Sequence, residues 1–287
     1  MRRSVGKQKV KKAQDEAPKK RARSLNWRTV RDVLLLTIWV FCSIIASQLV
    51  VGLIMALFIS LDQLDKPVMS GIYSLASYGI ALIMVLVVPP RVREKWFDSE
   101  KKKSKKDSVV RNSVAKGETL NKATKLRELE KLGLGGLPTW TDIGLSPVAY
   151  LVSTVLAIGL VYLFSLFPWF NAEQSQVTGF SPYMNSGEKA IAFLTLVVLA
   201  PIVEEVIFRG WLYGRLRARI GMAWSIIIVS VLFGLVHLQW NVGVNVFALS
   251  VVACVLREIT GTIYAGILTH MIKNGVAFYL LYVIGFG

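Results

Sequence analysis

The sequence predicts an all-α fold, a polytopic membrane helical bundle with about seven transmembrane helices, or eight. Three observations favour it: an excess of apolar residues, their arrangement in long uncharged runs, and the placement of Lys and Arg. Hydrophobic residues make up 54% of the 287 positions, whereas soluble domains contain roughly 45–50%. Residues 33–61 include no charged side chain, and a helix needs only about 20 apolar residues to cross a bilayer core.

Seven apolar segments are the candidate spans. The sixth has only 15 residues, and the seventh contains one charge, Lys273. In chain order the segments are Val33–Leu61, Val68–Pro90, Pro147–Asn171, Ala190–Val203, Met222–Leu238, Val242–Leu256 and Ile259–Phe286.

Lys and Arg gather in alternate connections between these segments. Residues 1–32 contain 12 and residues 91–146 contain 14, whereas the connections 62–67 and 172–189 contain one each. Cytoplasmic loops of membrane proteins carry this excess. We therefore expect a multi-pass protein of the cell membrane, with a cytoplasmic N-terminus and a C-terminus outside.

The chain is expected to divide into four regions. Residues 1–32 form a basic cytoplasmic tail, 33–90 the first two transmembrane helices, 91–146 a basic cytoplasmic linker, and 147–287 the main bundle. A short helix is expected near residues 120–131. We expect the basic segments to meet anionic lipids rather than nucleic acid, because no stacking aromatic residues interleave their Lys runs.

Both cysteines, Cys42 and Cys254, fall inside apolar spans and far apart in the sequence. The sequence therefore predicts small buried side chains rather than a disulfide framework.

Several polar side chains interrupt the last four spans. A charged group at the centre of a membrane helix costs about 2.5–3.5 kcal/mol on insertion scales, so such groups are candidates for function. The candidate site residues are Glu204, Glu205, Arg209, His237, His270 and Asn274.

Helical geometry separates the two adjacent glutamates. Glu205 and Arg209 are four residues apart, so they share a helix face and can pair. Glu204 points about 100° away from Glu205, which leaves its carboxylate free for another role. His270 and Asn274 are also four residues apart and place two hydrogen-bonding groups side by side.

This combination of side chains suits the hydrolysis of a peptide bond. A carboxylate can take a proton from water, histidine can orient that water or bind a metal, and N–H groups can stabilise the oxyanion. The chain contains no HExxH or GxSxG motif. The alternatives are a structural Glu–Arg pair with packing histidines, and a non-enzymatic transporter or scaffold that handles protons or metal.

Three motifs resemble those of the type II CAAX prenyl endopeptidases, also called CPBP intramembrane proteases or the Abi family. EEVIFRG matches an EExxxR motif, FGLVH places His four residues after Phe, and HMIKN matches HxxxN. The resemblance covers about residues 188–280. It implies a helical intramembrane endopeptidase, called a metalloprotease in much of the family, whose cavity is reached from the cytoplasm or laterally from lipid.

The resemblance also implies a role for each motif residue. Glu204 would be the general base, and His237 would position the water or ligate a metal. His270 and Asn274 would stabilise the oxyanion, while Glu205 and Arg209 would order the site. If a divalent metal such as Zn²⁺ were bound, its ligands would be Glu204, His237 and His270.

The substrates that the resemblance implies are membrane-associated peptides or proteins. Prenylated CAAX proteins are one class, and bacteriocin maturation or immunity is an alternative that the family offers.

The depths of the candidate residues agree only in part. Glu204 lies 11 residues before Arg215, about 16 Å along a helix. His237 lies 16 residues after Gly221, about 24 Å. This estimate places His237 deeper than the glutamates.

Overall fold

The computed structural model describes residues 27–58, 67–86, 126–174, 178–181 and 183–285. These residues form helices and connections, with no strand among them. The helices are α2 (Trp27–Phe58), α4 (Pro67–Leu86), α7 (Trp140–Phe164), α8 (Ser186–Phe193), η2 (Leu194–Leu199), α9 (Ala200–Glu205), η3 (Val206–Tyr213), α10 (Gly214–Ile220), α11 (Met222–Leu235), α12 (Trp240–Thr260), α13 (Tyr264–Tyr279) and η4 (Leu280–Ile284).

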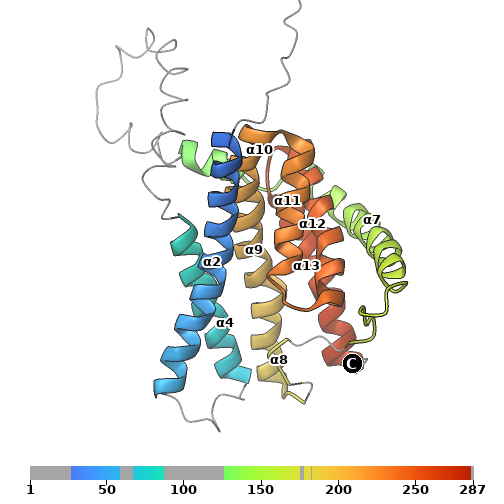
Figure 1. Cartoon of the computed structure of the whole chain (residues 1–287). Coiled ribbons are helices and arrows are strands. Elements are labelled where there is room, and N and C mark those ends of the chain that lie inside the picture. The colour runs from blue at the N-terminus through green and yellow to red at the C-terminus, as the bar shows by residue number, and fades with distance from the viewer. Residues whose placement is uncertain (1–26, 59–66, 87–125, 175–177, 182, 286–287) are drawn as a thin grey trace, which may run out of the picture.

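Six helical segments are long and apolar enough to cross a membrane, counted over the described residues. The fold is therefore the expected all-α polytopic bundle, and the chain is a multi-pass membrane protein. The fifth predicted segment forms α11, which is also helical but has only 14 residues. Helix α2 begins at the upper end of the bundle and the chain ends at the lower end (Figure 1).

The third span begins earlier than the sequence predicts, at Trp140 rather than at Pro147. The prediction excluded Asp142 because it is charged. Asp142 forms a capping box with Thr139 and accepts a hydrogen bond of 3.1 Å from Thr262 on the connection before α13. These bonds satisfy the carboxylate, so the helix can include it.

The fourth span is one continuous helical segment of 35 residues, from Ser186 to Ile220. The prediction stopped it at Val203, before the charged residues. Two stretches, η2 and η3, have π-helical hydrogen bonding. Such insertions in helices occur frequently at functional sites.

The upper half of the bundle is a packed apolar core. Phe208, Trp211, Leu212 and Leu216 are at most 1% exposed and pack in one cluster with α2 residues such as Leu36. At the upper end, Arg217 holds the carboxylate of Glu258 with two bonds of 2.9 and 3.1 Å, which ties α10 to α12.

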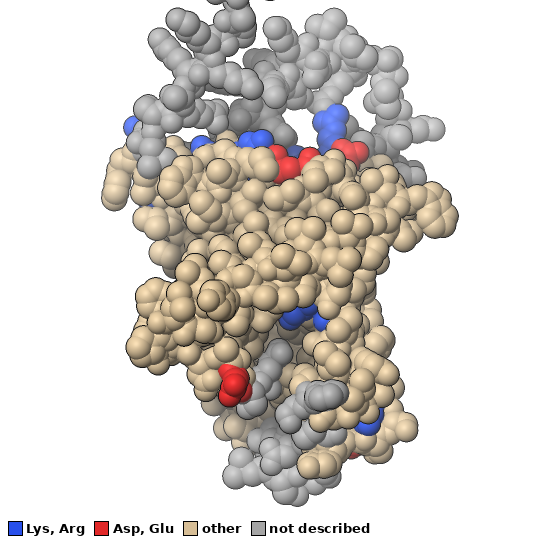
Figure 2. Space-filling view, turned by 90° about the vertical axis from the view of Figure 1, so that its right-hand side faces the viewer, with Lys and Arg blue, Asp and Glu red and all other residues tan. Residues whose placement is uncertain are grey.

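Charged side chains are concentrated at this upper end (Figure 2). A helix at residues 126–132 also lies here, as expected for the end of the linker. Most of the basic tail and linker, residues 1–26 and 87–125, lies outside the described residues.

Candidate active site

The carboxylate of Glu205 lies between the guanidinium of Arg209 and the imidazole of His270. Its Oε1 atom is 2.9 Å from Nη1 of Arg209 and 3.2 Å from Nδ1 of His270. Both Glu205 and Arg209 are fully buried. Nη1 of Arg209 is within ion-pair distance, but its N–H groups are not aligned for a hydrogen bond, so the attraction is chiefly coulombic. The pair predicted from the four-residue spacing is thus present, and it also holds the His270 ring.

The ring of Phe233 lies at the centre of this cluster. The Arg209 guanidinium stacks over it at 4.4 Å. The His237 and His270 rings meet it edge to face, with centroids 5.1 and 5.8 Å away. A guanidinium over an aromatic face is favourable, more so when both are desolvated. Phe233 therefore fixes three site residues at once.

Glu204 points away from Glu205, as the helix geometry predicts. Its Oε1 atom accepts a hydrogen bond of 2.8 Å from the hydroxyl of Tyr78 on α4. Its Oε2 atom is 3.8 Å from Nε2 of His270. The side chain of Glu204 is 14% exposed, whereas that of Glu205 is fully buried. Of the two glutamates, Glu204 is the one that a small molecule can reach.

His237 lies just beyond the end of α11. Its Nδ1 atom is 2.7 Å from the backbone oxygen of Phe233. A carbonyl oxygen can only accept a hydrogen bond, so Nδ1 carries the proton. In the neutral ring Nε2 then presents a lone pair, which can accept a hydrogen bond from water or ligate a metal.

Asn274 lies one turn after His270 on α13. Its side-chain amide donates a hydrogen bond of 2.9 Å to the backbone oxygen of Leu196, within the π-helical stretch η2. The second N–H of the amide has no part in that bond and can serve another acceptor.

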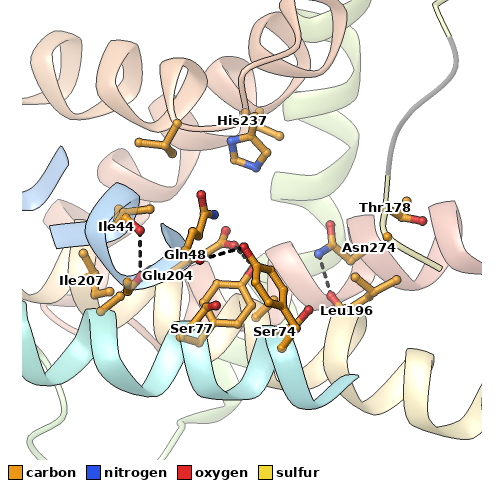
Figure 3. Close-up of a pocket in the computed structure, with 18 of the residues that line it drawn as sticks. Ile44, Gln48, Ser74, Ser77, Thr178, Leu196, Glu204, Ile207, His237 and Asn274 are labelled. Atoms are coloured by element: carbon orange, nitrogen blue, oxygen red, sulfur yellow. Dashed lines mark hydrogen bonds between the residues drawn. The ribbon is translucent and has the colours of Figure 1, made fainter. Parts of the chain in front are cut away.

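One cavity of about 420 Å³ brings these residues together. Glu204, His237, His270 and Asn274 all line it, and Figure 3 shows Glu204, His237 and Asn274 around the same space. Lys273, to which the sequence analysis gave no role, lines it as well. Glu205 and Arg209 lie behind the lining. The fourth helical segment, the turn after α11 and α13 supply the predicted site residues in the lining, and α2 and α4 complete it.

The depth mismatch expected for His237 does not occur. The estimate measured Glu204 from Arg215, but α10 continues to Ile220. Measured from Gly221, Glu204 is 17 residues before the turn and His237 is 16 residues after it. The two arms of this hairpin are therefore equally long, and both residues reach the same cavity.

Sequence reasoning missed three residues that shape the site: Tyr78, Phe233 and Gly266. Phe233 begins the FGLVH motif, but its contacts could not be inferred. Gly266 lies one turn before His270, and a Cβ atom there would lie 3.0 Å from Oε2 of Glu205. A glycine four residues before a motif histidine indicates a close contact only when the helix that packs against it is known.

The arrangement does not match a three-ligand metal site. Within the described part of the chain, no group of three or more His, Cys, Asp or Glu side chains is suitably placed to hold a metal ion. Glu205 is paired with Arg209, and Oε1 of Glu204 already accepts from Tyr78.

A second cavity, of about 520 Å³, lies between α7, α11 and α12 and has a mainly apolar lining that includes Phe164, Leu235 and Trp240. None of the predicted site residues lines it.

Comparison with known proteins gives one match. Residues 186–276 match the family model described as "Type II CAAX prenyl endopeptidase Rce1-like". The matched range contains all six predicted site residues. No curated protein and no solved structure matches the chain.

Proposed function

We propose that the chain, which matches the family model of type II CAAX prenyl endopeptidases over residues 186–276, is an intramembrane endopeptidase that hydrolyses peptide bonds with a glutamate-activated water. The observation that carries the proposal is the single cavity lined by Glu204, His237, His270 and Asn274. These residues come from three parts of the chain, and their convergence in an apolar bundle indicates a cavity that accommodates polar atoms.

Glu204 is the general base of this proposal. The hydroxyl of Tyr78 holds one carboxylate oxygen, which leaves Oε2 for a water molecule. Nε2 of His237 can accept the other hydrogen of that water, because Nδ1 is bonded to the Phe233 carbonyl. The water oxygen attacks the carbonyl carbon of the scissile bond while its proton passes to Glu204.

His270 and Asn274 then stabilise the oxyanion formed on the substrate carbonyl. Nδ1 of His270 faces Glu205, so His270 can donate through Nε2 only when both ring nitrogens carry protons. The free N–H of Asn274 is the second donor. When the C–N bond breaks, Glu204 passes its proton to the leaving amine, and an acid and an amine are released.

The buried pair of Glu205 and Arg209 acts through His270. The Glu205 carboxylate orients the imidazole of His270 at 3.2 Å. The Arg209 guanidinium compensates the negative charge of that carboxylate, which is buried away from water. Neither residue lines the cavity, so both are positioning residues.

The first prediction tests the role of Glu204. We expect Glu204→Gln to abolish cleavage, because the amide keeps the size of the side chain but cannot accept the proton of water. The measurement is cleavage of a membrane-peptide library by purified protein in proteoliposomes. Glu130→Gln, an exposed glutamate at the upper end, is the matched control and should cleave like wild type.

Thermal unfolding of the three proteins shows whether the loss is chemical. Glu204→Gln should keep the wild-type Tm within a few degrees. Near-wild-type turnover by Glu204→Gln would remove Glu204 from the base role. Absence of cleavage by wild type throughout the library, with protons or metal ions carried across the vesicle membrane, would favour the transporter alternative.

A further inference from the structure

The position of the cavity along the bundle decides from which side a substrate arrives. At one end it is lined by Thr178 and Gly179, which belong to the connection between α7 and α8. Ser70, one turn from the beginning of α4, also lines it. The start of α4 and the connection before α8 both lie at the lower end of the bundle (Figure 1). The cavity therefore runs from the glutamates toward the lower end.

The opposite direction is closed by packed side chains. Ile207 and Phe208, about one turn above Glu204, are the last residues of the fourth segment that line the cavity, and the neighbouring Arg209 is fully buried. Above them Trp211, Leu212 and Leu216 are at most 1% exposed and pack against α2. From Arg209 to Leu216 this layer is about 10 Å thick along the helix. Among the described residues, none of α10 or of the connection between α12 and α13 lines the cavity.

The two ends of the bundle differ in charge. The upper end carries the described Lys, Arg, Asp and Glu side chains of α10, α12 and the helix at 126–132, and Figure 2 shows them gathered there. The segments that enter this end, 1–32 and 91–146, contain 12 and 14 Lys and Arg residues. The connection at the cavity end, 172–189, contains only one Lys or Arg residue, Lys189. By the positive-inside rule the closed upper end is cytoplasmic.

We infer that the cavity is entered from the extracytoplasmic side, so that its substrates are the outward-facing segments of membrane-anchored polypeptides. A cytoplasmic C-terminal CAAX tail would have to cross the packed layer around Trp211 to reach Glu204. The choice of substrate class rests on the proposed endopeptidase function, whereas the direction of entry does not. The motif resemblance implied entry from the cytoplasm or laterally from lipid, and the inferred direction differs from the first of these.

The direction of entry is tested by cysteine accessibility in intact cells. Cys42, which is exposed, is replaced by Ser, while the buried Cys254 is kept. Single cysteines are then placed in the cavity (Ser74→Cys), on the lower connection (Tyr183→Cys, where the native side chain is 92% exposed) and at the upper end (Glu130→Cys). The probe is a charged, membrane-impermeant methanethiosulfonate, applied before and after permeabilisation.

We expect Ser74→Cys and Tyr183→Cys to be modified in intact cells, and Glu130→Cys only after permeabilisation. Modification of Ser74→Cys only after permeabilisation, together with Glu130→Cys, would overturn the inference. Modification of Glu130→Cys but not of Tyr183→Cys in intact cells would overturn it too, because the bundle would then be inverted. No modification of Ser74→Cys in either state would show that the cavity has no aqueous entrance.

The outcome is independent of the cleavage assay. Labelling reports access whether or not the protein cleaves peptides, and the Glu204→Gln comparison reports chemistry from whichever side the substrate is added. Extracytoplasmic labelling with no cleavage would retain the cavity assignment and reject the protease. Cleavage together with labelling only from the cytoplasmic side would support the protease and reject the extracytoplasmic entrance.

Discussion

At the scale of single residues, the carboxylate of Glu205 joins two helical segments. Oε1 meets Arg209 on its own segment and His270 on α13. Oε2 lies beside Gly266, only 3.0 Å from the position that a Cβ atom would take there. The absence of a side chain at position 266 is what allows the carboxylate to reach the His270 ring.

We expect Gly266→Ala to lower kcat about tenfold or more. A Cβ 3.0 Å from Oε2 of Glu205 must displace the carboxylate by a few tenths of an ångström and tilt His270. Misplacement of a catalytic group by about 1 Å can cost 10²-fold in rate. Steady-state cleavage measures it. Gly159→Ala is the matched control, because a Cβ there meets nothing within 4 Å. Equal rates for the two variants would show that the Glu205 position does not matter for catalysis.

His270 and Asn274 are expected to act as one unit on the oxyanion. Removal of one oxyanion donor typically costs about 10²–10³ in rate, so His270→Ala and Asn274→Ala should each fall in that range. The double variant should lose much less than the product of the two losses, because groups that act together are non-additive. Single-turnover cleavage by the three variants measures this, and fully multiplicative losses would contradict it.

The residues that the sequence could identify are those whose presence in a membrane helix is costly. Glu204, Arg209, His237 and His270 stand out because a polar group inside an apolar run needs a reason. Tyr78, Phe233 and Gly266 carry no such cost, and their importance arises only from what lies opposite them. Their roles could be seen only once α4, α11 and α13 had been placed around the fourth segment.

At the scale of the elements, α11 and α12 approach each other through two glycines. A Cβ on Gly234 would lie 2.9 Å from the backbone oxygen of Gly243, and a Cβ on Gly243 would lie 3.0 Å from that of Gly234. Small residues let helix backbones come close in membranes. This crossing lies three residues before His237 and thereby sets the position of its ring.

We expect Gly234→Ala to destabilise the protein by about 1–3 kcal/mol, the usual cost of overpacking, because the obstacle is a backbone carbonyl that cannot rotate away. The measurement is unfolding in mixed micelles. Gly144→Ala, where a Cβ meets nothing within 4 Å, should be neutral. An unchanged unfolding midpoint for Gly234→Ala would show that the two helices can separate without loss.

Helix ends were harder to predict than helix presence. The apolar runs identify every span, but the predicted spans end at charged residues, whereas the observed helices continue through them. Asp142 stays in α7 because Thr139 and Thr262 bond to it. Arg209 stays in the fourth segment because Glu205 pairs with it. The Thr139 and Glu205 contacts are local and the Thr262 bond is tertiary, and hydropathy records neither kind of contact.

At the scale of the whole molecule, the upper end of the bundle is charged and closed, and the cavity extends toward the lower end. The asymmetry follows from the chain itself, since the segments rich in Lys and Arg enter only the closed end. That the chain forms a bundle of apolar helices could be read from the sequence. The direction of the cavity could not, because it depends on which side of the glutamates the bulky residues of η3 and α10 pack.

The shortness of α11 has a consequence for the lipid around the protein. Its 14 residues span about 21 Å, whereas a typical hydrocarbon core is about 30 Å thick. Exposed Trp224 lies near its start, and Trp169 and Trp240, whose rings meet at 5.6 Å, lie beyond its end. Tryptophan prefers the headgroup level. On this flank we therefore expect hydrophobic mismatch, with the bilayer thinned and water brought closer to His237.

In vesicles of defined acyl chain length, cleavage should be faster in short-chain than in long-chain lipids.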